Sequence, residues 1–222
     1  MRAELESATL GVTAPTRIVL LPGAYHGPED FLREGFVDSV RRRRLPVDLL
    51  LVDPELAHLT DRSVLQQLRS KAVVQARAAG CASVWLAGIS MGGFLALLYA
   101  QCFPGDLDGL CLLAPYLGNR MITSEIARTG ALDGEPDSTL DALDEERRIW
   151  RYIKDRGVQA QPLYLGFGRE DRFAASHRLL AAELPAAAVD EVDGGHDWPV
   201  WQRLWNTFLD RFAAGASIRP CP

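Results

Sequence analysis

Short apolar runs recur along the chain, and each is followed by a loop and then by a stretch with helical spacing. The runs are continuously apolar rather than alternating, which is typical of strands covered on both faces. Strands that take turns with helices indicate parallel connections. The predicted strands lie at 17–23, 47–54, 83–90, 107–115, 162–168 and 187–196. We therefore predict an α/β fold with a doubly wound, mostly parallel sheet of about six strands.

Helical spacing is clearest in the two stretches between the first three predicted strands. In residues 29–44 the apolar side chains from Phe31 to Val40 share one helical face, and in residues 61–80 those from Val64 to Ala76 do the same. The pattern predicts one helix over each stretch. Further helices are expected after Ser90, from about Phe173, and after the last strand.

A stretch of about 45 residues, 116–160, is too long for a plain strand–helix–strand link. It contains a turn-rich part and then an amphipathic helix over 139–155, in which Asp144 and Arg148 are spaced for an i,i+4 ion pair. The apolar face of that helix is marked by Leu140, Leu143, Trp150 and Ile153. Long insertions in compact folds are usually lids or binding loops. We expect one domain over 1–222 with a cap at about 116–160.

Composition and charge exclude several classes of protein. The 222 residues are 48% hydrophobic with a net charge of −5, which argues against nucleic acid as a partner. No run approaches the roughly 18 apolar residues that a membrane span needs, and the first residues do not read as a secretory signal. The four cysteines lack the spacing of a metal site or disulfide framework. We expect a cytoplasmic protein without a metal, and its oligomeric state stays open.

Ser90 lies between an apolar run and a helical pattern, in the sequence "VWLAGISMGGFLALLYA". A nucleophilic serine must turn the chain sharply from strand to helix, so the residues two before and two after it come very close together. Here those residues are Gly88 and Gly92, and Gly93 gives further clearance. The G-x-S-x-G pattern in this strand–helix context predicts a nucleophile. The alternative is a tight turn in which the serine only caps the helix.

A serine hydroxyl needs a base to take its proton and a third group to orient that base. Of the four histidines, His196 follows the last strand and precedes the last helix, at the sheet edge where catalytic groups gather. We predict His196 as the base. His58 is expected in a surface loop, and His177 reads as a residue of a helix. His26, in the loop after the first strand, is a candidate substrate contact.

The orienting acid is expected at the end of another strand, between the serine and the histidine in chain order. Asp171, in "LYLGFGREDRF", meets that description, with Glu170 as the fallback. Asp190 and Asp193 lie on or beside the histidine's own strand, which makes them less suitable. Asp197 is expected to stabilise the N-terminus of the last helix.

An oxyanion also needs donors that are already in place. The N–H of Met91 begins the helix after the predicted nucleophile and is one such donor. The second is expected from the loop "PGAYHG", where Gly23 lets the chain bend so that the N–H of Ala24, or alternatively that of Tyr25, points into the site. The side chains of Tyr25 and His26 are the candidate substrate contacts.

Four motifs in order, "LPGAYHG", "AGISMGG", "GREDRF" and "GGHDW", resemble the α/β-hydrolase superfamily and particularly its small bacterial serine esterases. The resemblance covers residues from about 17 to 212. It implies the α/β-hydrolase fold with a short helical cap at about 116–160. It also implies a catalytic triad and an oxyanion hole, formed respectively by Ser90, Asp171 and His196 and by Ala24 and Met91.

The chain departs from that family in two places. Many members have His-Gly where this chain has Pro22 and Gly23, which bears on the second oxyanion donor. The residues before the first predicted strand are also too few for the first two strands of the full fold, so a trimmed sheet is expected. Neither departure touches the predicted triad.

The predicted function is that of a serine hydrolase that cleaves small-molecule carboxylic esters through an acyl-serine intermediate, with no cofactor. A thioester or an amide is the alternative substrate, because the same triad activates the same nucleophile for each. A different class is a binding module that has kept the fold and lost catalysis. A dehalogenase is disfavoured, because those relatives carry Asp where this chain has Ser90.

Overall fold

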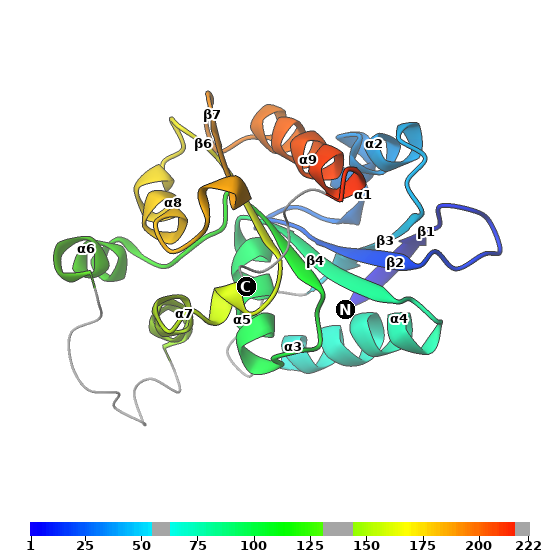
Figure 1. Ribbon diagram of the computed structural model, residues 1–222, viewed down its shortest axis with the longest axis horizontal. Coiled ribbons are helices and arrows are strands. Elements are labelled where there is room, and N and C mark those ends of the chain that lie inside the picture. The colour runs from blue at the N-terminus through cyan, green and yellow to red at the C-terminus, as the bar shows by residue number, and fades with distance from the viewer. Residues whose placement is uncertain (55–62, 131–143, 216–222) are drawn as a thin grey trace.

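A seven-stranded sheet runs through the middle of the molecule (Figure 1). The computed structural model describes residues 1–54, 63–130 and 144–215. The strand order is β1-β3-β2-β4-β5-β6-β7, and all neighbours are parallel except β1 and β3, which are antiparallel. The strands are β1 (Arg2–Glu6), β2 (Thr16–Leu21), β3 (Val47–Asp53), β4 (Ser83–Ile89), β5 (Gly109–Leu113), β6 (Leu163–Gly168) and β7 (Val189–Val192).

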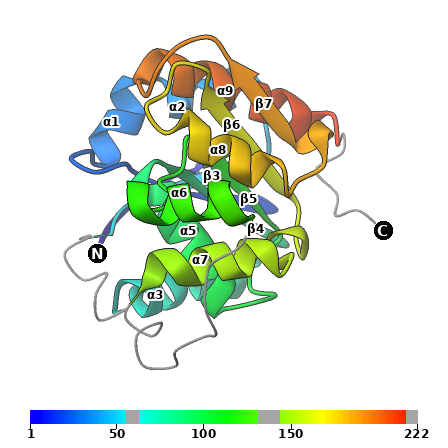
Figure 2. The ribbon, with the colours of Figure 1, turned by 90° about the vertical axis from the view of Figure 1, so that its left-hand side faces the viewer.

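Helices cover both faces of the sheet (Figures 1 and 2). One face carries α1 (Pro28–Arg33), α2 (Phe36–Arg42) and α9 (Trp198–Ala213). The other carries α3 (Ser63–Leu68), α4 (Val74–Ala78), α5 (Met91–Cys102) and α7 (Glu145–Lys154). Beside β6 lies α8 (Ala174–Ala181), with α6 (Arg120–Thr129) packed against it. The predicted doubly wound α/β fold is confirmed.

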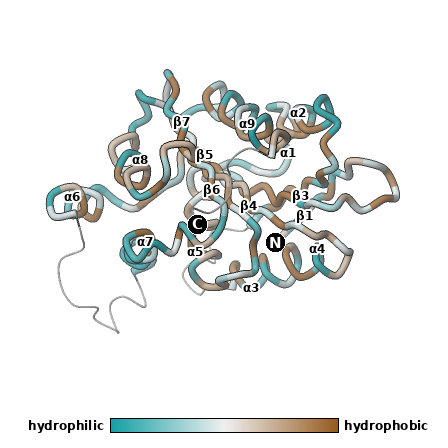
Figure 3. The backbone as a smooth tube through the Cα atoms, viewed as in Figure 1, coloured by the Kyte–Doolittle hydropathy of each residue, from teal (hydrophilic) through white to brown (hydrophobic). Residues whose placement is uncertain are grey.

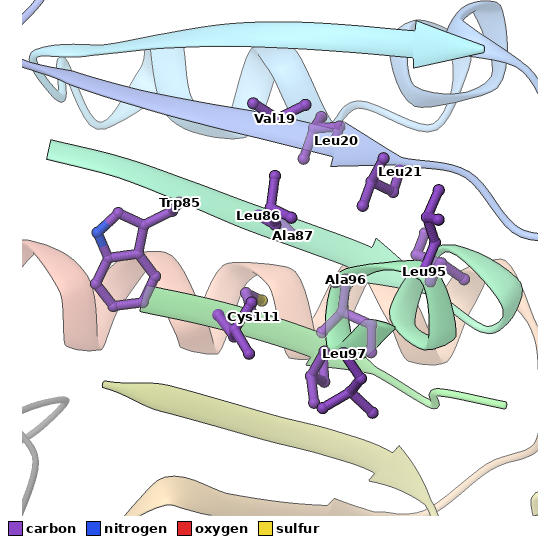
Figure 4. Close-up of a cluster of buried hydrophobic side chains, with 14 of the residues drawn as sticks. Val19, Leu20, Leu21, Trp85, Leu86, Ala87, Leu95, Ala96, Leu97 and Cys111 are labelled. Atoms are coloured by element: carbon purple, nitrogen blue, oxygen red, sulfur yellow. The ribbon is translucent and has the colours of Figure 1, made fainter. Parts of the chain in front are cut away.

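The hydrophobic core includes buried residues of β2, β4 and α5, and hydrophobic segments of the chain gather along the sheet (Figure 3). Leu20 and Leu86 on the two strands and Leu95 on α5 are each 1% exposed or less, and they lie within the same cluster (Figure 4). α5 is buried continuously from Gly92 to Ala100, so it packs on several sides rather than along one stripe. This burial fixes the position of the residue that precedes α5, which is Ser90.

Two local features differ from the sequence-based expectation. The single helix expected over 29–44 is two helices, because Gly35 adopts a left-handed φ of 74° that breaks the turn between α1 and α2. The sheet has one strand more than the six expected, since β1 pairs antiparallel with β3 at the edge. The residues of β1 are mostly exposed, so no apolar run marks that strand.

The helix expected over 61–80 is present from Ser63 onward. It consists of α3, a π-helical turn at Arg69–Val73, and α4. Its apolar face is buried as expected, with Val64, Leu68 and Ala76 at 1% exposure or less. His58 lies outside the described residues.

The segment 116–160 contributes α6, which the sequence pattern did not predict, and α7, which it did. Trp150 and Ile153 on α7 are fully buried, and the indole N–H of Trp150 donates to the carbonyl of Leu117 at 2.7 Å. Two further positions of the predicted apolar face lie outside the described residues, namely Leu140 and Leu143. The buried face of α7 therefore packs this part of the segment onto the rest of the molecule.

The expected ion pair between Asp144 and Arg148 is wrong. Asp144 instead caps α7, where its carboxylate accepts from the backbone N–H of Arg147. The same carboxylate pairs with the Arg147 guanidinium at 3.2 Å. Arg148 pairs with Glu145 at 3.4 Å and donates to the side chain of Gln101 on α5. Capping takes Asp144 away from its i+4 neighbour, because the N-cap carboxylate turns back over the first turn.

Within the described part of the chain, no helix is both long and apolar enough to cross a membrane.

Candidate active site

Ser90 occupies a sharp turn between β4 and α5, with φ 52° and ψ −112°. Two of the surrounding glycines are required by close approach of backbone. A Cβ on Gly88 would lie 2.3 Å from the carbonyl carbon of Gly92, and a Cβ on Gly92 would lie 2.1 Å from the carbonyl oxygen of Leu21. No side chain fits either place, which is why the motif spaces glycines around the serine.

Backbone hydrogen bonds hold Ser90 in this strained conformation. Its N–H donates to the carbonyl of Leu113 at 3.0 Å, at the end of the neighbouring strand β5. Its carbonyl accepts from the N–H groups of Tyr116 at 2.9 Å and Phe94 at 3.1 Å. Leu113 at the end of β5 and Tyr116 shortly after it thus hold the serine backbone through both its N–H and its carbonyl.

The side chains of Ser90, His196 and Asp171 form a continuous chain of hydrogen bonds. Nε2 of His196 lies 3.0 Å from Oγ of Ser90, and Nδ1 lies 2.7 Å from Oδ2 of Asp171. A carboxylate only accepts, so Nδ1 carries the proton and Nε2 is free to accept from the serine hydroxyl. The Asp171 side chain is fully buried and the imidazole is 12% exposed.

The environment of Asp171 favours its ionised form. Burial by itself raises the pKa of this carboxyl, but the hydrogen bonds from His196 and from the backbone N–H of Phe173 at 2.8 Å outweigh it. The net effect lowers the pKa of Asp171 below its ordinary value. A buried carboxylate held in this way orients the imidazole and favours positive charge on it.

The other carboxylates weighed as the acid are engaged elsewhere. Glu170 accepts from the backbone N–H of Gly194, Asp190 pairs with an arginine of α9, and Asp193 pairs with an arginine at the end of β6. Asp197 caps α9, where its carboxylate accepts from the N–H of Val200 at 3.2 Å. The prediction for Asp197 is therefore confirmed.

The two backbone groups expected as oxyanion donors lie next to Ser90. Met91 is the first residue of α5, and a helix supplies no carbonyl for the N–H at that position. On the other side, a Cβ on Gly23 would lie 3.5 Å from Cβ of Ser90, so the loop that continues to Ala24 runs beside the serine. Within the described residues, the N–H of Ala24 has no acceptor.

The two candidate substrate contacts differ in position. Tyr25 is fully exposed, at a left-handed φ of 66° at the tip of the turn. His26 is half-buried, with its ring edge-on to Trp198 at 5.1 Å and to Trp201 at 6.0 Å between centroids. Trp201 also meets the ring of His196 edge-on at 5.1 Å. Only His26 is thus connected through packed rings to the hydrogen-bonded chain.

His177 is the group near this site that the sequence pattern undervalued. It lies on α8 with no exposed surface, and its Nε2–H donates to the carbonyl of Pro115 at 2.9 Å. Burial lowers the pKa of His177 to about 4, so the ring is neutral at pH 7. Pro115 directly precedes the N–H that binds Ser90. The signal that could have found His177, a histidine on the apolar face of a helix, is weak without the fold.

The aromatic ring of Phe173 completes the surroundings of the imidazole. It meets His196 edge-on at 5.3 Å between centroids, and it also contacts Tyr116 at 5.9 Å. In the described part of the chain, no cluster of three histidine, cysteine or acidic side chains could hold a metal ion. The arrangement therefore offers proton transfer to and from a serine hydroxyl, next to free backbone donors.

Solved structures share this architecture over nearly the whole chain. A fluorophosphonate-binding serine hydrolase F of Staphylococcus aureus has 13% identity and a TM-score of 0.64, covering 92% of this chain and 86% of that one. Est1E from Butyrivibrio proteoclasticus has 18% identity and a TM-score of 0.63, with 95% and 94% covered. MGS-MChE2, an α/β hydrolase from a lagoon-sediment metagenome of Mar Chica, has 19% identity and a TM-score of 0.62, with 96% and 94% covered.

No curated protein sequence matches this chain significantly. The similarity to the solved structures is one of fold, since their sequence identities lie below 20%. The family model is more specific, because it matches the sequence itself over residues 18–216 and so includes every residue of the hydrogen-bonded chain. On that match, the chain belongs to the alpha/beta hydrolase family.

Proposed function

We propose that the protein is a serine hydrolase that cleaves small-molecule carboxylic esters. One observation carries the proposal, namely the hydrogen-bonded chain from Oγ of Ser90 through His196 to the ionised Asp171, at 3.0 and 2.7 Å. The esterases and serine hydrolases among the neighbouring folds support the same reaction type.

In the proposed mechanism His196 takes the hydroxyl proton as Ser90 attacks the carbonyl carbon of the ester. Asp171 stabilises the imidazolium that results. The N–H groups of Met91 and Ala24 stabilise the oxyanion, where each donor typically contributes roughly 3 kcal/mol. His196 then passes its proton to the leaving alcohol, and water hydrolyses the acyl-Ser90 by the same steps.

The proposal includes the organisation of the chain. A single catalytic domain carries the triad, and residues 116–160 form the cap beside it. The reaction uses no cofactor and takes place in the cytoplasm. An ester is preferred to an amide as the substrate because the ester carbonyl is less stabilised by resonance, and a thioester is the alternative on the same triad.

The first experiment compares Ser90→Ala with Ser39→Ala, a serine buried on α2. We expect a fluorophosphonate probe to label the wild-type protein and Ser39→Ala but not Ser90→Ala. Hydrolysis of p-nitrophenyl acetate should fall roughly 1,000-fold or more in Ser90→Ala. Full activity in that variant would exclude the mechanism.

A binding module that has lost catalysis is distinguished by the same samples. Such a module would bind ligands equally well with and without the Ser90 hydroxyl and would not be labelled by the probe. A comparison of acyl-CoA, ester and anilide substrates of one acyl length then separates the thioesterase and amidase alternatives.

A further inference from the structure

A hollow with a volume of about 640 Å³ is lined by residues of α6 and α8 and of the loops that precede them. The two helices lie side by side (Figure 2). We call this cavity the α6–α8 hollow. The residues of its lining that matter here are Tyr116, Asn119, Arg120, Thr123, Arg172 and Phe173. Its size is within the range of small-molecule pockets.

Two of the lining residues place the hollow directly beside the proposed reaction centre. Phe173 packs its ring edge-on against His196 at 5.3 Å and donates its N–H to Asp171. Tyr116 donates its N–H to the carbonyl of Ser90 at 2.9 Å. The lining of the hollow and the surroundings of the serine and the histidine therefore share these two residues.

The lining is positively charged. Arg120 comes from the first turn of α6 and Arg172 from the loop before α8, and no acidic residue is among the described residues that line the hollow. The guanidinium of Arg172 lies over the ring of Phe173, 4.8 Å from its centroid, which places this cation beside the aromatic neighbour of His196.

Both guanidinium groups lack a carboxylate partner among the described residues. Two arginines on neighbouring helices are instead paired with carboxylates, in a chain whose net charge is −5. Arg147 on α7 pairs with Glu125 at 2.8 Å, and Arg178 on α8 pairs with Glu191 at 2.6 Å. In the described part of the chain, no carboxylate pairs with Arg120 or Arg172.

The carboxylate of Glu146 touches two lining residues, but it is already engaged. It accepts from the Tyr116 hydroxyl at 2.7 Å, and from the backbone and side-chain amides of Asn119 at 2.8 and 2.7 Å. Burial and the bond to Glu146 raise the pKa of Tyr116, so its hydroxyl stays a donor to that carboxylate. The Glu146 carboxylate therefore accepts three hydrogen bonds, all of them from Tyr116 and Asn119.

From this charge and position we infer that the hydrolase acts on esters or thioesters that carry an anionic group, and that Arg120 and Arg172 bind this group in the α6–α8 hollow. The inference rests on the proposed function of Ser90. A guanidinium presents paired donors that match a carboxylate or a phosphate, and these two sources share the same anionic chemistry.

The test uses pairs of substrates that differ only in the anionic group. The mono-p-nitrophenyl esters of adipic and pimelic acids are compared with p-nitrophenyl hexanoate and heptanoate, which probe the acyl side. 4-Acetoxybenzoate and 4-acetoxyphenyl phosphate are compared with 4-acetoxybenzamide, which probe the leaving-group side and separate carboxylate from phosphate. We expect the anionic member of at least one pair to have a kcat/KM about tenfold higher.

The variants Arg120→Gln and Arg172→Gln are expected to lower the anionic-to-neutral ratio of kcat/KM by about fivefold each, mainly through KM. Arg172→Glu should reverse the preference. Arg156→Gln is the matched control, because Arg156 is also exposed and without a carboxylate partner in the described structure but does not line the hollow.

Equal kcat/KM values within every pair would overturn the inference, and so would an equal fall of the ratio in Arg156→Gln. Either result leaves the proposed function standing as long as neutral esters are hydrolysed and Ser90→Ala is inactive. Full activity of Ser90→Ala would instead remove the proposed function.

Discussion

The turn that carries Ser90 and the α6–α8 hollow are neighbours, yet they are built in opposite ways. At the turn, close backbone contacts leave room only for glycine, and hydrogen bonds fix the peptide on both sides of the serine. At the hollow, long arginine side chains from two separate segments carry charge that no carboxylate of the described residues neutralises. The turn is specified by steric fit, whereas the hollow is distinguished by the charge of its exposed arginines.

This difference separates the task of holding the reacting serine in place from the task of selecting the substrate. A strained backbone must be over-determined by its surroundings, so changes at the turn should damage the fold and the reaction together. Exposed charges contribute little to folding, so changes of Arg120 or Arg172 should alter the choice of substrate and leave stability nearly unchanged. His177 links the two regions, because it lies on α8 beside the hollow and donates to the carbonyl of Pro115 beside the turn.

The largest effect is expected from Gly92→Ala. The new Cβ would lie 2.1 Å from the carbonyl oxygen of Leu21, and backbone on both sides would have to move. We expect the free energy of unfolding to fall by about 3 kcal/mol or more, measured by urea denaturation. Ester hydrolysis should be lost with it, because the serine leaves its position.

Gly195→Ala is the matched control for that change. A Cβ on Gly195 meets only the Asp197 carboxylate, at an ordinary distance of 3.5 Å. Its free energy of unfolding should stay within about 0.5 kcal/mol of the wild type. Equal stability of Gly92→Ala and Gly195→Ala would show that the turn is not fixed by steric fit.

The same contrast explains which features of the fold and of the candidate site could be predicted from the sequence. The parallel sheet was predictable because the strands from β2 to β6 carry continuous apolar runs, whereas β7 at the edge is partly exposed and contains Asp190 and Glu191. Ser90, Asp171 and His196 were predictable as a set because each follows a strand at the same edge of the sheet, and because glycines mark the turn. The structure brings these three side chains within hydrogen-bonding distance.

The features that sequence reasoning missed depend on contacts between distant segments. β1 is exposed and polar, and it is a strand because β3 offers it an edge. His177 becomes a buried donor only through Pro115, 62 residues away in the chain. The pair of Arg120 and Arg172 exists only once α6 and the loop before α8 come together. No local periodicity carries such information.

An intermediate effect is expected from His177→Gln, as a change in the pH dependence of stability. Burial lowers the pKa of His177 from 6.5 to about 4, so the unfolded state takes up a proton at pH 5 and the folded state does not. Lowering the pH from 7 to 5 therefore destabilises the wild type. We expect this loss to be about 2 kcal/mol larger than in the variant, in urea titrations at both pH values.

Glutamine suits this comparison because it can still donate to the carbonyl of Pro115 but does not titrate. Any cost of repacking is present at both pH values and cancels in the difference. If wild type and His177→Gln lost equal stability between pH 7 and pH 5, the ring would not be the buried neutral group that links α8 to the turn.

The smallest effect is expected from Asn119→Ala, at the edge of the hollow. The Asn119 side chain caps α6, accepting from the N–H groups of Met121 at 2.9 Å and Ile122 at 3.2 Å. Its loss should lower the free energy of unfolding by about 1 kcal/mol, measured by urea denaturation. Asn119→Ser should recover most of that loss, because the serine hydroxyl keeps an oxygen that can cap α6. It does not restore the side-chain bond to Glu146. A cost for Asn119→Ala as large as that of Gly92→Ala would mean that the hollow, like the turn, is held by steric fit, and the two regions would no longer differ in kind.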